Sequence, residues 1–301
     1  MLARRLGFAA SWKMLRLQKG WVKPLLILTL VGWIPILGQM VVLGYAFEWA
    51  RLTAWGADTA PKQHGIDFSK LIKTGAICWL VMFTLRLVWV VVAKALFGGT
   101  SLAWMPMGMV LDLGDLISGR FPLDTESLVE GLVDQLLAAF VMCAMMRATV
   151  YDDFAAGWRL DRLFQMIARD AGGFARMYLS VLLAAFVAWA YWFVLSVVCT
   201  SLLIVMGVAA YLSGSFAADI TDIVHLMAQI GPLSLLGWSV VAVLAVFAGG
   251  VVGTAMQLLG INVVGQWFCR FDVARWGVSS APLPDGVPVR AAAAEAGEGS
   301  E

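Results

Sequence analysis

Charged residues are scarce in this chain of 301 residues, where Asp, Glu, Lys and Arg together make up only 14%. Soluble globular proteins carry about 25% charged residues. Hydrophobic residues make up 61% of the chain, and the mean hydropathy is +0.85. This composition excludes a soluble two-domain enzyme, a nucleic-acid-binding protein and a disordered protein. It predicts an all-α fold, a polytopic helical bundle within a membrane.

Residue types that bind metals or carry out catalysis are also few and scattered. The chain has two histidines and four cysteines, and no CxxC or Cys–His spacing links Cys78, Cys143, Cys199 and Cys269. The motifs GxxxxGK[ST], GxSxG and HExxH are missing from the sequence. We therefore expect no catalytic residue, no metal and no cofactor, and we expect the cysteines to act as small buried hydrophobic residues.

Five apolar runs define a membrane domain over residues 24–276, since a helix needs about 20 apolar residues to cross a bilayer. They cover residues 24–47, 75–97, 135–151, 177–212 and 233–268. The last two runs are much longer than one untilted span, which leaves room in each for a break or an interfacial extension. Residues 277–301, rich in Pro, Ala, Gly and Glu, are expected to form a disordered cytoplasmic tail.

Residues 1–23 are predicted to form a basic amphipathic helix that lies at the membrane surface. Apolar residues recur there every three or four positions, and cations fall roughly opposite them: Leu6, Ala10, Met14, Leu17 and Trp21 against Arg5, Arg16, Lys19 and Lys23. Residues 152–176 repeat this pattern with four arginines. Such helices place cations beside anionic lipid headgroups, so the lipid bilayer is the expected partner. A membrane-protein partner or a second copy is a further expectation, whereas nucleic acid is not.

The distribution of Lys and Arg predicts the orientation, because cytoplasmic loops are enriched in both. By this rule the N-terminus, residues 48–74, residues 152–176 and the C-terminus lie in the cytoplasm, and the chain is a multi-pass protein of the cell membrane. Residues 98–134 and 213–232 then lie outside. Four crossings satisfy this arrangement: residues 75–97, 135–151, 177–212 and 233–268.

The first apolar run does not fit as a fifth crossing, because both of its flanks are basic. We expect a re-entrant or broken helical hairpin that turns near Pro35 and Gly38. Proline removes a backbone donor and glycine permits a turn, while Gln39 offers hydrogen bonds where lipid offers none. The alternative is a single kinked span followed by a basic outer loop.

Three sequence elements resemble a family of bacterial and archaeal membrane proteins called domain of unknown function 4013. They are Trp33-Ile34-Pro35-Ile36-Leu37-Gly38 with Leu43-Gly44-Tyr45, Ala148-Thr149-Val150-Tyr151 with Phe154-Ala155-Ala156-Gly157, and a distal Gly265-Gln266. The chain departs from the family at Ala60-Pro61-Lys62-Gln63, where a Leu-Pro-x-Trp element is expected. The resemblance implies a multi-spanning membrane fold and brings no known activity or catalytic residue.

Arg86 is the most informative single residue, because it lies in the middle of an apolar run. A charge at such a position costs about 3 kcal/mol or more if it has no partner. We expect it to face the protein interior, within a candidate intramembrane polar site made of Arg86, Gln39, Pro35, Gly38, Gln257 and Asn262. Such a site either binds an anion, headgroup or solute, or simply joins helices.

Two functions follow from these features. The first is a non-enzymatic scaffold or accessory subunit of the cell envelope. The alternative is a passive permease or a lipid- or solute-handling protein with a midplane site around Arg86 and the Pro35–Gly38 break.

Overall fold

The computed structural model describes residues 2–97, 125–212, 232–271 and 273, and all regular elements in these ranges are helices. They are α1 (Phe8–Leu15), α2 (Val22–Gly32), α3 (Leu37–Ala54), α4 (Phe68–Phe97), α6 (Thr125–Tyr151), α7 (Phe154–Gly157), α8 (Leu160–Arg169), α9 (Ala171–Leu212) and α11 (Pro232–Cys269). The predicted all-α fold is thus confirmed. The tail 277–301 and residues 98–124 and 213–231 of the predicted outer loops lie outside the described residues. Residues 125–134, predicted as part of an outer loop, belong to α6.

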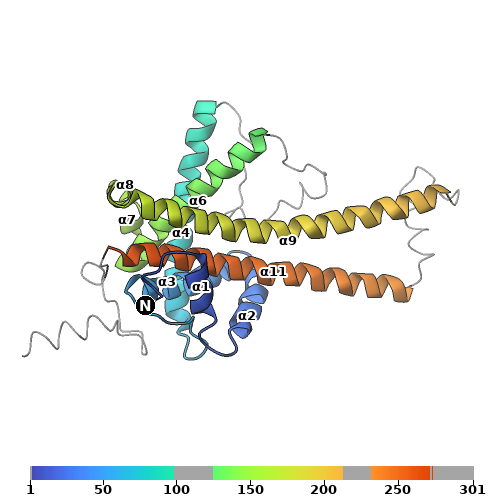
Figure 1. The fold of residues 1–301 in the computed structure, drawn as a ribbon, viewed down its shortest axis with the longest axis horizontal. Coiled ribbons are helices and arrows are strands. Elements are labelled where there is room, and N and C mark those ends of the chain that lie inside the picture. Colours follow the sequence, from blue (N-terminus) through green and yellow to red (C-terminus); the bar gives the residue numbers. More distant parts are fainter. Residues whose placement is uncertain (1, 98–124, 213–231, 272, 274–301) are drawn as a thin grey trace, which may run out of the picture.

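The longest elements, α9 and α11, form an antiparallel pair (Figure 1). At one end Arg270 pairs with Asp170, at 2.8 Å, and farther along the Tyr191 hydroxyl donates to the Ala245 carbonyl, at 2.7 Å. Later residues of α9 therefore contact earlier residues of α11, with similar spacing along the two helices. Both helices run without interruption, so the break for which their length left room does not occur.

Helix α3 occupies the centre of the fold, where every residue from Val42 to Ala54 is buried. It packs on α2, α4 and α11, and small residues sit at each of these contacts. A Cβ atom built on Gly75 of α4 would lie 1.8 Å from the Met40 carbonyl oxygen, and one on Gly265 of α11 would lie 2.4 Å from that of Ala50. The helices therefore approach until their backbones touch.

The first apolar run folds back on itself between α2 and α3. Ile36 has a φ of 61°, a conformation that β-branched residues rarely adopt. A Cβ on Gly38 would lie 1.9 Å from the Val31 carbonyl oxygen, so only glycine lets α3 turn so closely against α2. At the open end of the hairpin, the Cβ position of Gly20 lies 3.5 Å from Gln63 Oε1. The predicted hairpin is confirmed, and the single kinked span is not what the chain adopts.

The N-terminal segment differs from the prediction. Residues 1–23 do not form one helix: α1 covers Phe8–Leu15, and α2 begins at Val22. The apolar side of α1 does not face lipid, since Met14 and Leu15 are buried in the protein core and the helix packs on α11 and α9. Of the predicted apolar face, protein covers Ala10 and Met14, whereas Leu17 is exposed.

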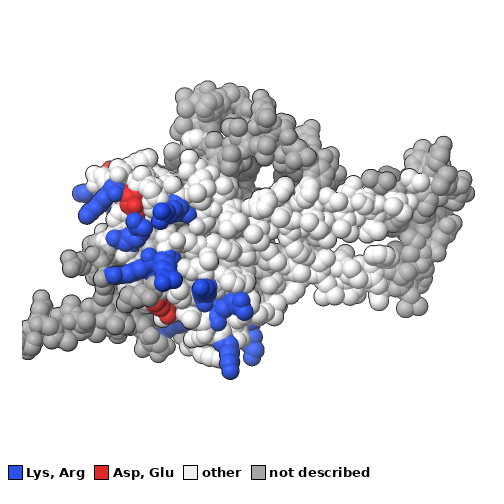
Figure 2. All heavy atoms as spheres, viewed as in Figure 1, with Lys and Arg blue, Asp and Glu red and all other residues white. Residues whose placement is uncertain are grey.

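Positively charged side chains gather at one end of the molecule (Figure 2). Contacts join the segments that the Lys and Arg distribution placed on one side. Asp58 accepts hydrogen bonds from the N–H groups of Leu2 and Ala3, and Lys73 pairs with Asp152 at 2.8 Å. The Arg270–Asp170 pair adds the end of α11. The expected cytoplasmic segments thus lie at a common end of the fold.

Within the described ranges, three helical stretches are long and apolar enough to cross a membrane: Phe68–Val91, Ala171–Leu202 and Leu236–Cys269. Gln135–Tyr151 is shorter and apolar, and belongs to α6, which starts earlier than predicted. Helices α4 and α6 run across the α9–α11 pair rather than alongside it (Figure 1). The chain is therefore a helical membrane protein in which two groups of long helices diverge from a buried junction.

Replacing Gly75 with Ala should destabilise the protein, because the new methyl group forces α4 away from α3. Overpacking of this kind costs about 1–3 kcal/mol, so we expect an apparent melting temperature in detergent lower by at least about 2 °C. The matched control is Gly253→Ala on α11, where no atom lies within 4 Å of the Cβ position. That variant should be as stable as the wild type or more so, and equal melting temperatures for the two variants would contradict the close packing.

The common basic end can be tested by labelling single cysteines in intact cells. His64 and Arg162 are both exposed and lie in different segments of this end. In a background without Cys199, the one exposed cysteine among the described residues, His64→Cys and Arg162→Cys should label only after the membrane is permeabilised. Labelling of one from outside and the other from inside would refute the arrangement.

Candidate functional site

Three of the predicted site residues lie together at the hairpin turn. Pro35 is exposed in the turn, Gly38 is buried against α2, and the Gln39 side-chain amide donates to the Gly32 carbonyl at 3.3 Å. This carbonyl belongs to the last turn of α2, where no later helical N–H is available to it. Gln39 therefore stabilises the helix break, because its side chain bonds a backbone carbonyl that the turn leaves without a helical partner.

Arg86 lies on α4, away from this turn. Helices α3 and α4 touch at Met40 and Gly75, and Arg86 follows Gly75 by about 16 Å along the helix. Its side chain is half-buried, as expected for a cation that faces the protein. The structure does not place Arg86 beside Gln39, and a ligand-binding role for it stays a prediction.

Asn262 belongs to a different polar cluster, at the other end of α3. Its amide donates to Thr53 Oγ1, at 2.7 Å, and its oxygen accepts from Ser11 Oγ, at 3.0 Å, and from the Gln266 amide, at 3.2 Å. Gln266 also accepts from the N–H of Gly7. Ser11, Thr53, Asn262 and Gln266 all have an exposed fraction of 0%. This cluster attaches α1 to α3 and α11.

Gln257 lies on α11 between these two regions and is half-buried. Thr53 and Gln39 are about 21 Å apart along α3. The six predicted residues therefore occupy at least two separate regions: the hairpin turn, and the attachment site of α1.

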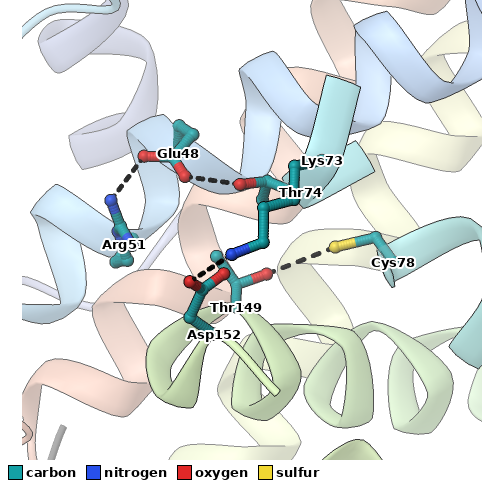
Figure 3. A network of polar contacts seen from close by, with 7 residues as sticks. All are labelled: Glu48, Arg51, Lys73, Thr74, Cys78, Thr149 and Asp152. Atoms are coloured by element: carbon teal, nitrogen blue, oxygen red, sulfur yellow. Dashed lines mark hydrogen bonds and ion pairs between the residues drawn. The ribbon is translucent and has the colours of Figure 1, made fainter. Parts of the chain in front are cut away.

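A buried ion pair that the sequence did not predict lies near the middle of the fold (Figure 3). Glu48 accepts hydrogen bonds from Arg51, at 2.7 Å, and from Thr74 Oγ1, also at 2.7 Å. The exposed fractions of Glu48 and Arg51 are 8% and 2%. The sequence predicts a polar loop for both residues, because the apolar run stops at Phe47. The helix instead continues to Ala54, and the i, i+3 spacing of opposite charges was the available signal.

The network continues from α4 to α6 (Figure 3). Lys73 precedes Thr74 and pairs with Asp152 just after α6, and one turn farther along α4 the Cys78 thiol contacts Thr149 Oγ1 at 3.2 Å. Thr149 also donates to the Met145 carbonyl within α6. The network therefore links the basic end of α3, α4 and α6 through side chains of both charges.

The end of α6 is shaped by two consecutive aspartates. Asp152 has a φ of 51°, which ends the helix, and Asp153 accepts from the N–H of Ala155 at the start of α7. Arg147 Nε then donates to the Ala156 carbonyl, at 3.3 Å. Against α7, a Cβ on Gly157 would lie 2.9 Å from a methyl group of Val81. The turn thus packs α7 against both α6 and α4.

Cysteines and acidic residues show no arrangement typical of a metal centre in the described ranges. Cys78, Cys143 and Cys269 are buried, as expected, whereas Cys199 on α9 is exposed. Among the described residues, no three His, Cys, Asp or Glu side chains lie close enough to hold a metal ion.

Helical architecture, apolar spans and buried polar contacts define this chain as a helical membrane protein. A model of a protein family of unknown function, DUF4013, matches residues 27–195, and the chain belongs to this family. The comparison with curated proteins and the comparison with solved structures gave no match.

Several residues that carry the family resemblance lie at contacts between segments of the fold, although residues 33–37 are exposed. Gly38 meets α2, Gly44 meets Leu71 of α4, and the Tyr45 hydroxyl donates to the Lys62 carbonyl at 2.6 Å. Gly157 packs on α4 and α6. The distal pair Gly265-Gln266 falls beyond the matched residues, and it too joins helices, to α3 and α1. These signature residues position helices against one another.

Replacing Glu48 with Gln should strongly destabilise the protein, because Arg51 would keep its buried charge without the matching anion. Breaking a buried ion pair in this way costs about 3–5 kcal/mol. The double variant Glu48→Met, Arg51→Met removes both charges and should recover most of the lost stability. The readout is the apparent melting temperature of the solubilised protein.

The matched control for this pair is Asp161→Asn. Asp161 and Arg162 form an exposed pair at 3.6 Å, with side chains 64% and 57% exposed. Its loss should cost less than about 1 kcal/mol. If Glu48→Gln proves as mild as this control, Glu48 and Arg51 do not hold the junction together.

Proposed function

We propose that this protein is a non-enzymatic scaffold or accessory subunit of the cell envelope. The observation that carries the proposal is that the buried polar side chains described above are engaged by other groups of the fold. Glu48 accepts hydrogen bonds from Arg51 and Thr74, and Asn262 is hydrogen-bonded to Ser11, Thr53 and Gln266. Polar groups bonded in this way fix the positions of the helices. A scaffold needs fixed helices, because it must present a constant surface to its partners.

The exposed part of the long helix pair supports the same proposal. No charged residue occurs in residues 177–212 or in α11, and large apolar side chains along both helices are exposed in the isolated chain, among them Val194, Val205, Leu236 and Leu244. In a membrane this surface faces lipid or the helices of a partner protein.

The alternative, a passive permease or a lipid- or solute-handling protein, is favoured by one observation. The helix break at Trp33–Ile36 exists, and broken helices often line transport sites. On this proposal Arg86 would line the path of the solute, whereas in a scaffold it would mainly join helices.

Replacing Arg86 with Leu separates the two functions. As a structural residue of a scaffold, Arg86 should be needed for assembly, and we expect the amount of folded protein in the membrane to fall at least about twofold, with Arg86→Lys restoring part of it. The measurement is quantitative immunodetection of solubilised, monodisperse protein. Unchanged abundance combined with loss of solute flux in proteoliposomes would overturn the scaffold and favour the permease.

A second experiment tests the scaffold directly. Affinity purification from native membranes, followed by mass spectrometry, should recover at least one membrane protein whose abundance falls when this chain is deleted. Recovery of the chain alone, with an unchanged membrane proteome after deletion, would contradict the proposal.

A further inference from the structure

One face of α2, the first arm of the hairpin, is apolar and exposed along its length. On α2 it consists of side chains spaced three or four residues apart: Leu26, Ile27, Leu30 and, in the turn, Ile34, with exposed fractions of 38, 61, 55 and 52%. The opposite side of α2 is buried, and Thr29 there contacts Thr254 of α11 at 3.2 Å. The hairpin thus has one protein-facing side and one apolar side that the chain itself leaves uncovered.

Cations surround the start of this face. Lys23 lies on the same side of α2, one turn before Leu26 and Ile27, and three further exposed cations precede it; together they form the cationic collar, Lys13, Arg16, Lys19 and Lys23. The first 47 residues contain no Asp or Glu, so no acid from this segment neutralises the collar. Trp12 and Trp21 pack edge to face beside it, with Arg16 over the Trp12 ring at 5.9 Å.

The dimensions of this surface are those of one membrane leaflet. From Lys23 to Gly32 the helix rises about 14 Å, and Ile34 follows in the turn. Half of the hydrocarbon core is about 15 Å thick, and tryptophan is enriched where it meets the headgroups. This surface has a cation at one end, tryptophans beside the cation, and only apolar side chains beyond. It therefore matches a single phospholipid, which has a charged headgroup and apolar chains.

We propose that the cationic collar and the outer face of α2 form a binding surface for anionic phospholipid. The lipid phosphates lie at the collar, and the acyl chains lie along Ile27, Leu30 and Ile34. This inference is independent of the scaffold function. It also changes the sequence-based prediction, since the apolar part of the lipid surface is α2 and not α1.

Helix α8 offers a matched comparison within the same chain. Arg159, Arg162 and Arg169 are exposed there, but Leu163 is buried, and Phe164 is the one large apolar side chain that α8 exposes. Helix α8 therefore carries exposed cations without a row of exposed apolar side chains beside them. If charge alone attracted lipid, α8 and the collar would bind it equally well.

The first test measures depth with spin labels. Single cysteines at Lys23, Ile27, Leu30 and Ile34, in full-length protein lacking Cys199, are labelled and placed in nanodiscs of palmitoyl-oleoyl phosphatidylglycerol and phosphatidylcholine. Accessibility to oxygen should rise, and accessibility to a water-soluble nickel chelate should fall, from position 23 to position 34. Nickel accessibility at 27 and 30 equal to that at 23 would overturn the proposal and assign this face to a protein partner.

The second test measures lipid selectivity. Native mass spectrometry counts the phosphatidylglycerol molecules retained by detergent-purified protein in competition with phosphatidylcholine. The triple variant Arg16→Gln, Lys19→Gln, Lys23→Gln should lose at least about tenfold in preference for phosphatidylglycerol, because each cation near an anionic headgroup contributes severalfold. Replacing Lys19 and Lys23 with Arg should preserve the preference.

The control carries the same change in charge on α8: Arg159→Gln, Arg162→Gln, Arg169→Gln. It should retain most of the preference, while Ile27→Ser, Leu30→Ser should weaken retention of both lipids. An equal loss in the α8 variant, or no loss in the collar variant, would show that net charge rather than this surface binds the lipid, and would refute the proposal. Because all these side chains are exposed, the variants are expected to fold, which their melting temperatures will verify.

Discussion

Backbone contact between α3 and its neighbours is the constraint on which the rest of the structure depends. Apolar side chains gain little by leaving lipid for another helix, so helices in membranes associate through close packing and polar contacts. Here Gly38, Gly44, Gly75 and Gly265 bring α2, α4 and α11 so near that a methyl group would collide with a carbonyl oxygen. The sharp hairpin and the burial of most of α3 both follow from these approaches.

Close approach also dictates how the buried polar groups must be arranged. With α3 enclosed, water cannot satisfy Glu48, Arg51 or Thr53, and each unsatisfied polar group would cost about 1–3 kcal/mol or more. The structure meets most of this demand locally: Arg51 and Thr74 bind Glu48, and Asn262 binds Thr53. Polar residues of this kind specify which helices meet and at which residues, whereas the apolar surfaces around them do not.

Several features could be predicted from the sequence because each depends on residues close together in the chain. The hairpin follows from basic flanks on both sides of an apolar run. Periodicity predicts a helix over residues 152–176, but this segment divides into α7, α8 and the start of α9. The clusters could not be predicted, because they join residues far apart: Ser11 meets Asn262 only once α1 lies on α11. Periodicity also indicates which face of α1 is apolar but cannot tell whether lipid or protein covers it.

Arg86 and Glu48 show the same limit from opposite directions. Arg86 stood out because it interrupts an apolar run, and chain position could not supply the partners that the fold gives it. Glu48 does not stand out, because the first charge after an apolar run usually indicates the end of a buried helix. Arg51, three residues later, is the internal partner that lets the helix continue. A charge that is paired within one turn need not end a buried helix, and this rule would have found the junction.

The lengths of the two diverging helix groups set a final condition on how the protein sits in a bilayer. Helix α11 has 38 residues and is about 57 Å long, while a bilayer with its headgroup regions is about 40–45 Å thick. A tilt of about 40°, at the upper end of the observed range, brings the helix within that thickness. Because α4 runs across the α9–α11 pair, both groups can cross one bilayer only if they tilt in opposite senses (Figure 1). The two groups meet at α3, and this junction holds the close contacts of Gly44 and Gly75 and the buried pair of Glu48 and Arg51.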